Sequence, residues 1–469
     1  MVYRILRWLA RTSVRIFFRR IEVEGVENVP RTGPVLLVPN HPNAIVDALV
    51  VVMHIKRPIS VTAKSTLADF FLMGQVIRST NVILFHRKKD MGKGADPSRN
   101  TEAIAQCRRR LEQGEAILIF PEGQSHSDPG LRPLRPGAAR IALDYLHSEK
   151  RPGSLVIIPV GLHFPEKDRF RSDVWIRFGK PFDPRKWQEE NPDDGPLELT
   201  AEIESRIRKL TLNFERRPDS LLLMWAAEIL ETGAAPPARL GLEKHRVSRR
   251  LKLVQLLNEG YKQLKDDQAD DIARLRKRVR AYRLELRGLG IKPSEVYLRM
   301  PAWRVARFVI RELVILVVGM PIAAWGILNH IIPVAIIGTL AVTFSVEKDK
   351  WASNVVLPTA VFIPIFYTIQ ITAGWFFLTS VWASLYMVSL PISGVFAILY
   401  RDRVGNIWYR ARTFFLFLKN PDLRERLGRE GRSIIEDLTR LGEKLEEEKT
   451  DVETQGCGEK PGDETLPFD

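Results

Sequence analysis

The chain has 469 residues, of which 45% are hydrophobic, and it carries a formal net charge of +15. This length allows two or three domains with full cores. Two cysteines, Cys107 and Cys457, exclude a disulfide-based scaffold and indicate reducing surroundings. The basic residues occur without the aromatic or zinc-binding motifs of nucleic-acid-binding modules, so the charge favours an anionic membrane surface and no nucleic-acid partner.

Residues 1–20 are expected to form an amphipathic helix. Arginines recur at a spacing of three and four, mostly along one face, and apolar side chains, several of them aromatic, fill much of the rest. Such a helix is suited to the lipid headgroup layer, and we predict an interfacial position for it. The alternative is an ordinary helix packed on the protein's own core.

His41 and Asp47 form the central candidate pair. His41 follows a strand-like run from Pro34 to Pro39 and precedes a helix-like run from Ile45 to Ile55. A histidine near its ordinary pKa can take a proton from a hydroxyl, and a nearby carboxylate can orient the ring. Taken alone, the pair is more often a surface histidine and a helix-start acid favoured by the helix dipole.

Further chemical groups follow other apolar strands. Lys64 and Arg87 each end one, and the third ends in Phe120-Pro121-Glu122-Gly123. Open α/β sheets place ligands at the carboxyl ends of their strands. Strands that alternate with helices therefore predict an α/β domain over 21–215, with a mixed sheet and helices packed on it.

These motifs together resemble the glycerophosphate acyltransferase superfamily. Its blocks are a histidine followed closely by an aspartate, an arginine after a strand, Phe-Pro-Glu-Gly, and a later strand with proline, here Val156 to Gly161 with Pro159. Five residues separate His41 from Asp47, where the commonest form of the family has four, and this resembles the fungal-type glycerol-3-phosphate and dihydroxyacetone-phosphate acyltransferase branch. With this longer spacing, the sequence does not decide whether the Asp47 side chain contacts that of His41.

The resemblance implies a role for each site residue. His41 would be the general base, oriented by Asp47. The substrate-binding residues would be Arg87, Phe120, Pro121, Glu122, Gly123, Pro159, Lys64 and Arg135. Arg87 is suited to paired hydrogen bonds with phosphate, and the Glu122 carboxylate to substrate hydroxyls. Backbone amides near Gly123 or in the turn 40–43 are candidate oxyanion donors. No metal and no cofactor beyond the thioester co-substrate are expected.

The second half of the chain changes character. Residues 216–303 are charged and helical, and we expect short antiparallel helices that cover the catalytic domain. Residues 313–346 and 351–400 contain no Asp, Glu, Lys or Arg, which predicts membrane-spanning helices within 304–400. Arginines on both flanks favour an even number, and we predict four spans as two hairpins, with two as the alternative. The turns would lie at Asn329 to Pro333 and near Thr372 to Gly374. A helical region, 401–439, and a disordered tail, 440–469, would follow.

The sequence thus predicts an integral membrane O-acyltransferase whose catalytic domain faces the cytoplasm. The donor would be acyl-CoA or acyl-carrier protein, and the acceptor glycerol 3-phosphate, dihydroxyacetone phosphate or lysophosphatidate. Membrane lipids would be its other partners. A lysophospholipid-remodelling acyltransferase and a catalytically idle membrane scaffold are the alternatives.

Overall fold

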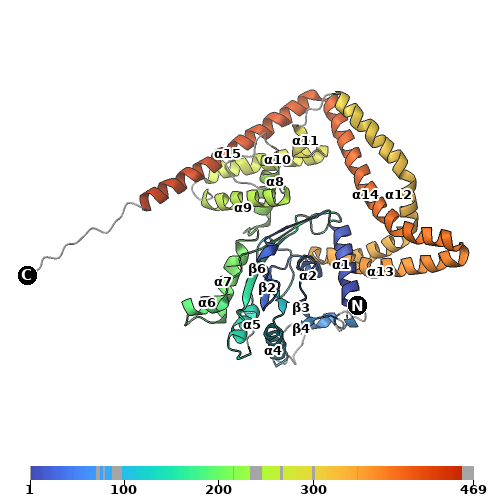
Figure 1. The fold of residues 1–469 in the computed structure, drawn as a ribbon. Helices are drawn as coiled ribbons and strands as arrows, with labels where there is room; N and C mark the ends of the chain where they lie inside the picture. The colour runs from blue at the N-terminus through green and yellow to red at the C-terminus, as the bar shows by residue number, and fades with distance from the viewer. Residues whose placement is uncertain are drawn as a thin grey trace, which may run out of the picture. The chain divides into compact units, whose positions relative to one another are not determined.

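The computed structural model describes residues 2–69, 74, 75, 77, 80–86, 98–150, 153–214, 216–232, 246–264, 268–297, 302–345 and 347–456. The chain divides into two compact units (Figure 1). Unit 1 comprises residues 1–215 and 318–400, and unit 2 comprises 216–317 and 401–469. Two long helices therefore contribute to both units.

Unit 1 is built on a seven-stranded mixed sheet in the order β1-β7-β6-β2-β5-β3-β4. All neighbouring strands are parallel except β6 and β7. The strands are β1 Arg20–Glu24, β2 Val35–Pro39, β3 Ile59–Lys64, β4 Val82–Phe85, β5 Ala116–Leu118, β6 Val156–His163 and β7 Asp173–Phe178. The predicted mixed α/β sheet is confirmed.

Helices cover both faces of the sheet because successive residues of a strand point to opposite sides. Val35 and Leu37 of β2 lie in one core with α1 Val2–Phe17, α2 Ala44–Val52 and α13 Lys348–Phe377. Leu36 and Val38 lie in a second core with α4 Ser98–Glu112, α5 Gly137–Leu146 and α7 Pro196–Arg208. Figure 1 shows α1, α2 and α13 grouped together. The remaining short helices are η1 Val26–Asn28, η2 Ser65–Leu67 and α6 Pro184–Glu190.

The carboxyl-terminal half of α1 packs on this domain. Val14 and Phe17 are fully buried or nearly so, and Arg7 donates hydrogen bonds to the carbonyls of Val52 and Ile55. Trp8 remains 64% exposed. The helix therefore docks on the protein's own core along one side, and the interfacial role of its other side stays a prediction.

Three helices in the described residues are long and apolar enough to cross a membrane, within α12 Ala302–Phe344, α13 and α14 Ser380–Lys419. The structure thus offers three candidate spans where four, or alternatively two, were predicted, and the number of crossings stays a prediction. The expected turn at Asn329 to Pro333 is absent because α12 continues through Pro321 and Pro333, as helices packed against neighbours in apolar surroundings can. The other break lies at Leu378, after α13, and not at Thr372 to Gly374.

Unit 2 is a helical assembly of α8 Arg217–Leu230, α9 Arg246–Leu264, α10 Ala269–Leu289, α11 Pro293–Val296 and α15 Pro421–Gly456, with the outer ends of α12 and α14. Its core includes Tyr282, Leu286, Leu427 and Ile434. The tail predicted to be disordered from residue 440 is helical to Gly456, since the Glu- and Lys-rich stretch consists of good helix formers.

Candidate active site

Four adjacent strands end at one edge of the sheet, and three of these ends deliver candidate residues that the structure describes. β2, β5, β3 and β4 are adjacent and parallel, so their carboxyl ends point the same way. His41 follows β2, Glu122 follows β5, and Lys64 ends β3. Arg87 comes two residues after β4 in sequence, and its own position lies outside the described residues. The topology thus gathers motifs that are separated by up to about 80 residues.

His41 and Asp47 are in contact despite the five intervening residues. The distance between Nδ1 of His41 and Oδ2 of Asp47 is 2.8 Å, and the same oxygen accepts a hydrogen bond of 2.7 Å from the Asn43 N–H. Nδ1 therefore carries the ring proton and donates a hydrogen bond to the carboxylate, so the free lone pair of the ring is on Nε2. Within the part of the chain that the structure describes, Nε2 has no hydrogen-bonding partner, and the His41 side chain is 13% exposed. This is the arrangement of a general base.

Asp47 is completely buried at the start of α2. Burial raises the pKa of Asp47 from its ordinary value of 3.8, and the hydrogen bond and charge of His41, the Asn43 amide and Lys167 oppose that rise. Its other oxygen, Oδ1, has no partner among the described residues. The carboxylate is thus held with little solvation, which costs stability and fixes its position against the histidine.

The backbone at the start of α2 is unusual. Ala44 has φ of 46°, in the left-handed region that residues with a Cβ avoid. Asn43 is the residue before the helix, but its side chain makes no capping hydrogen bond. The turn that aims Asp47 at His41 is therefore strained and lacks the usual local cap.

Glu122 holds the loops around His41. It is 3% exposed, and Oε1 accepts a 2.6 Å hydrogen bond from the His41 N–H. Oε2 accepts from the Arg132 N–H at 3.1 Å and from Nε2 of His126. Since protein groups bind both oxygens, the structure gives Glu122 a positioning role, and its predicted contact with substrate hydroxyls stays a prediction.

The other residues of the Phe120–Gly123 motif shape the surface beside the pair. The Phe120 ring stacks on His41 with centroids 3.9 Å apart and an interplanar angle of 17°. Pro121 accepts a 2.8 Å hydrogen bond from the Arg135 N–H. Gly123 has φ of 72°, and a Cβ placed there would lie 2.9 Å from Cδ of Arg135. The exposed side chain of Arg135 therefore crosses Gly123 and brings its charge to the motif.

The family model described as Acyltransferase matches residues 20–163, which include the pair, the Phe120–Gly123 motif and Pro159. This segment is an acyltransferase-family domain.

Among known proteins, the chain is similar to glycerol-3-phosphate O-acyltransferase 2 of Saccharomyces cerevisiae, with 28% identity over 44% of this chain and 26% of that protein. It is also similar to 1-acyl-sn-glycerol-3-phosphate acyltransferase of Borreliella burgdorferi, with 27% identity over 26% of this chain and 46% of that one. The crystal structure of the 1-acyl-sn-glycerophosphate (LPA) acyltransferase of Thermotoga maritima matches with 20% identity and a TM-score of 0.34, over 44% of this chain and 76% of that one. The chain spans only 26% to 39% of the length of the fungal relatives it matches.

Asn40 is a residue of the acyltransferase domain whose structural role the sequence analysis missed. Its side chain donates to the Leu162 carbonyl at 3.0 Å and accepts from the Leu162 N–H at 2.7 Å. The amide thereby extends the β2–β6 ladder by one step after Pro39 and fixes where His41 begins. The sequence contained a sign of this role, because the side-chain amide of an asparagine directly after a strand can form the hydrogen bonds that a backbone amide would form.

Pro159 lies inside β6, opposite Val38, and is buried. Its carbonyl accepts a 2.8 Å hydrogen bond from the Gly179 N–H, and its ring packs 2.9 Å from the position of a Cβ on Gly179. The structure gives Pro159 a packing role and does not place it beside His41. Its predicted contact with substrate stays a prediction.

Lys167 and His126 also contribute to the acyltransferase domain without having been predicted. Nζ of Lys167 donates 3.0 Å hydrogen bonds to the carbonyls of Pro42 and His126, which ties the His41 loop to the loop after Gly123. Nδ1 of His126 accepts from the Asp128 N–H at 3.1 Å, so its proton lies on Nε2 and is donated to Glu122. Both are loop residues without a strand-end signal in the sequence, and only the fold brings them to the site.

Four of the backbone amides in the predicted oxyanion region are paired within the protein. Asn40 N–H donates to Val160, His41 N–H to Glu122, Asn43 N–H to Asp47 and Gly123 N–H to Phe120. The identity of the oxyanion donors near Gly123 stays a prediction.

Lys64 is located as predicted, at the carboxyl end of β3 beside β5. From the register of Val61 with Leu118, Lys64 is level with Pro121. Lys64 at the end of β3 and Arg135 over Gly123, in the loop after β5, form a basic border, which Arg87 is predicted to extend. Their contact with phosphate stays a prediction.

Proposed function

We propose that the protein is an O-acyltransferase of glycerolipid synthesis, which transfers a fatty acyl group from a thioester to a hydroxyl of a phosphate-bearing acceptor. The observation that carries the proposal is the 2.8 Å contact between His41 and buried Asp47. It puts the proton on Nδ1 and leaves Nε2 as the basic nitrogen of a partly exposed His41, in a domain whose strand ends also carry Lys64 and Arg135. A general base beside an anion-binding border is what hydroxyl acylation on a phosphate ester requires.

The reaction proceeds by attack of the acceptor on the thioester. Nε2 of His41 takes the proton of the acceptor hydroxyl as the oxygen forms its bond to the thioester carbonyl carbon. The carbon–sulfur bond then breaks, and the thiolate of CoA or acyl-carrier protein leaves with a proton returned from His41. Asp47 stabilises the imidazolium that exists between the two proton transfers. Phe120, stacked on the ring, limits its rotation.

The acceptor is held through its phosphate. Arg135 crosses Gly123 in the loop after β5, and Lys64 ends β3, the strand next to β5. Arg87 would extend this basic border. The names of the similar proteins favour glycerol 3-phosphate or 1-acylglycerol 3-phosphate as acceptor. Dihydroxyacetone phosphate presents the same phosphate at a similar distance from a hydroxyl.

The three candidate membrane helices would bring this chemistry to a lipid surface. A long acyl chain leaves the bilayer at a cost of about 0.8 kcal/mol per methylene, so the base must act close to the headgroups. α13 is both a candidate span and part of the core under β2. The catalytic domain would face the cytoplasm, where acyl-CoA and acyl-carrier protein occur.

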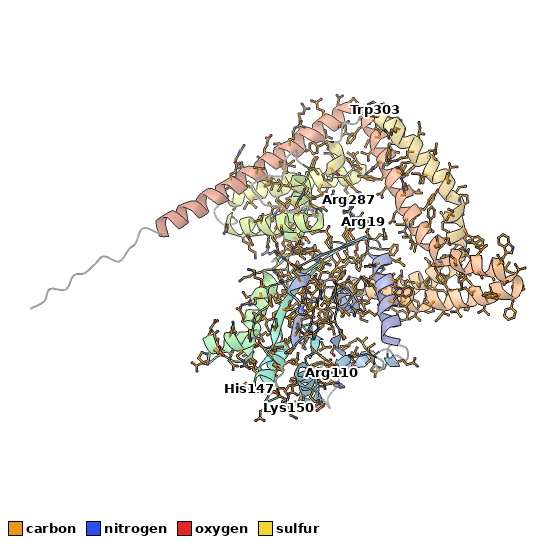
Figure 2. The ribbon with its side chains drawn as sticks, in the orientation of Figure 1. Arg19, Arg110, His147, Lys150, Arg287 and Trp303 are labelled. Atoms are coloured by element: carbon orange, nitrogen blue, oxygen red, sulfur yellow. The ribbon has the colours of Figure 1, made fainter. Side chains whose placement is uncertain are left out.

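The test is a radiolabelled acyl-transfer assay on isolated membranes, with each acceptor and each thioester donor in parallel. His41→Ala should lower transfer by about a hundredfold to ten-thousandfold. His147→Ala is the matched control, since His147 is exposed at the end of α5 (Figure 2) and bonds to Leu143 of its own helix. More than a tenth of wild-type activity in His41→Ala would contradict the assignment.

The same assay separates the alternatives. Acylation of lysophospholipids with large headgroups, and not of the small phosphate esters, would make the protein a remodelling acyltransferase. No transfer to any acceptor would favour a membrane scaffold, although such a scaffold has no need for a buried aspartate aligned on a histidine.

A further inference from the structure

The start of α2 obtains its cap from a distant helix. Four N–H groups at the beginning of any α-helix lack partners within it, and a side chain just before the helix usually accepts one of them. Asn43 does not. Instead, Oγ of Ser353, on α13, lies 3.3 Å from the N–H of Val46 and accepts its hydrogen bond.

Ser353 also donates to the same turn. Its hydroxyl lies 3.4 Å from the carbonyl oxygen of Asn43, so one side chain bonds both ends of the segment that contains the strained Ala44. Ser353 is 3% exposed, and its neighbours Ala352 and Val356 are buried in the core that α2 shares. The hydroxyl is therefore enclosed, and water cannot replace the backbone groups of this turn as its hydrogen-bonding partners.

A second contact joins the same end of α13 to the loop after Gly123. Asp349 is 2% exposed and accepts a 2.6 Å hydrogen bond from the Ser125 hydroxyl. One turn of α13 thus binds the loop that carries Glu122 and His126, and the next turn binds the start of α2, which carries Asp47. Both segments hold the groups that orient His41.

We infer that Ser353 is a positioning residue, which acts from a membrane-span candidate on the His41–Asp47 pair by capping α2. The inference deepens the proposed function and rests on it for the kinetic readout. Losing the hydroxyl leaves the Val46 N–H without an acceptor and frees the turn, so Asp47 no longer fixes the ring of His41. The loss should appear in kcat, because the substrates do not bind to Ser353.

The contact itself is tested without activity, by hydrogen–deuterium exchange on the full-length protein in detergent. The peptide that covers residues 43–47 should exchange slowly in the wild type and faster in Ser353→Ala. Ser384→Ala is the matched control, because Ser384 is exposed on α14 and its hydroxyl bonds to Ser380 of its own helix. It should leave this peptide unchanged. Equal exchange in Ser353→Ala and the wild type would overturn the inference, whatever reaction the protein catalyses.

The role is tested by a double-mutant cycle in the acyl-transfer assay. Ser353→Ala should lower kcat about tenfold, as expected when a buried N–H loses its acceptor, with both KM values within about twofold of wild type. In the Asp47→Asn background, Ser353→Ala should lower kcat little further, because the carboxylate through which Ser353 acts on His41 is already absent. Equal losses in both backgrounds would show a purely structural serine. An inactive wild type would refute the proposed function and leave the exchange result to decide the contact.

Discussion

Gly123→Ala gives a stringent test of the phosphate site because its two effects can be separated. Gly123 has φ of 72°, and alanine in this region costs about 1–2 kcal/mol of folding free energy, offset by about 0.4–1 kcal/mol from the less flexible unfolded chain. The net cost is about 1 kcal/mol. Gly33 has φ of 81° and no atom within 4 Å of a Cβ built there, so Gly33→Ala measures this backbone cost alone.

The second effect falls on Arg135. The new methyl group would lie 2.9 Å from Cδ and 3.0 Å from Nε of Arg135, inside ordinary contact distance. Arg135 is exposed and flexible, so it can move at small cost in stability. Its guanidinium, however, leaves the position from which it would bind phosphate. Charge-assisted hydrogen bonds contribute about 1.5–3 kcal/mol, which corresponds to roughly 10- to 100-fold in the acceptor's kcat/KM.

Both variants should therefore lose similar stability in thermal unfolding, and only Gly123→Ala should lose acceptor kcat/KM. The donor's KM should stay unchanged in both. If Gly123→Ala keeps its acceptor kcat/KM within twofold of Gly33→Ala, then Arg135 does not hold the acceptor, and the phosphate site must be sought at Lys64 or Arg87.

Three further predictions concern other parts of the site. Burial raises the pKa of Asp47 above its ordinary value of 3.8, so between these two pKa values the folded protein binds more protons than the unfolded chain. The free energy of unfolding therefore falls as the pH rises from 3.8 to the folded-state pKa, and above that pKa the loss stays constant. Asp47→Asn should thus unfold at a higher temperature than the wild type, with a larger difference at pH 7.5 than at pH 4.5, while acyl transfer falls. A smaller difference at pH 7.5 than at pH 4.5 would show that the folded-state pKa of Asp47 is not raised. Arg87→Lys should raise the acceptor's KM and spare the donor's in steady-state assays, and an unchanged acceptor KM would remove Arg87 from the site. Trp8→Glu, at an exposed position of α1, should leave thermal stability unchanged and lower activity on long-chain donors more than on short, water-soluble ones, whereas equal losses would show that α1 serves only the fold.

The strands and the order of the motifs were predictable because each strand of this sheet is a short apolar run with a polar group at its end. The contact of His41 with Asp47 was not, since a helix with regular geometry would place a residue with this spacing differently. The left-handed Ala44 takes up the extra residue, and nothing in its type signals that conformation. Neighbouring structure imposes it.

Contacts between segments far apart in the sequence could not be predicted either. The apolar run 351–400 predicts membrane helices, yet the first two turns of α13, where this run begins, bring Asp349 and Ser353 into contact with the loop after Gly123 and the start of α2. A hydrophobicity pattern cannot show which polar residue at the edge of a span has a partner about 300 residues earlier. The expected break at Asn329 to Pro333 is absent for a related reason, because a proline in a helix surrounded by other helices need not end it.

The contact between Val46 and Ser353 also has a consequence for biosynthesis. The two residues are 307 positions apart, and a ribosome that adds 5–20 residues per second needs about 15–60 s to pass from one to the other. During that interval the nascent chain already contains His41 and Asp47, but the cap of α2 has not been synthesised. Under the proposed function, catalytic competence would arrive only once α13 has been synthesised, after the candidate span α12, so a newly made chain would acquire its activity at the bilayer and not before it.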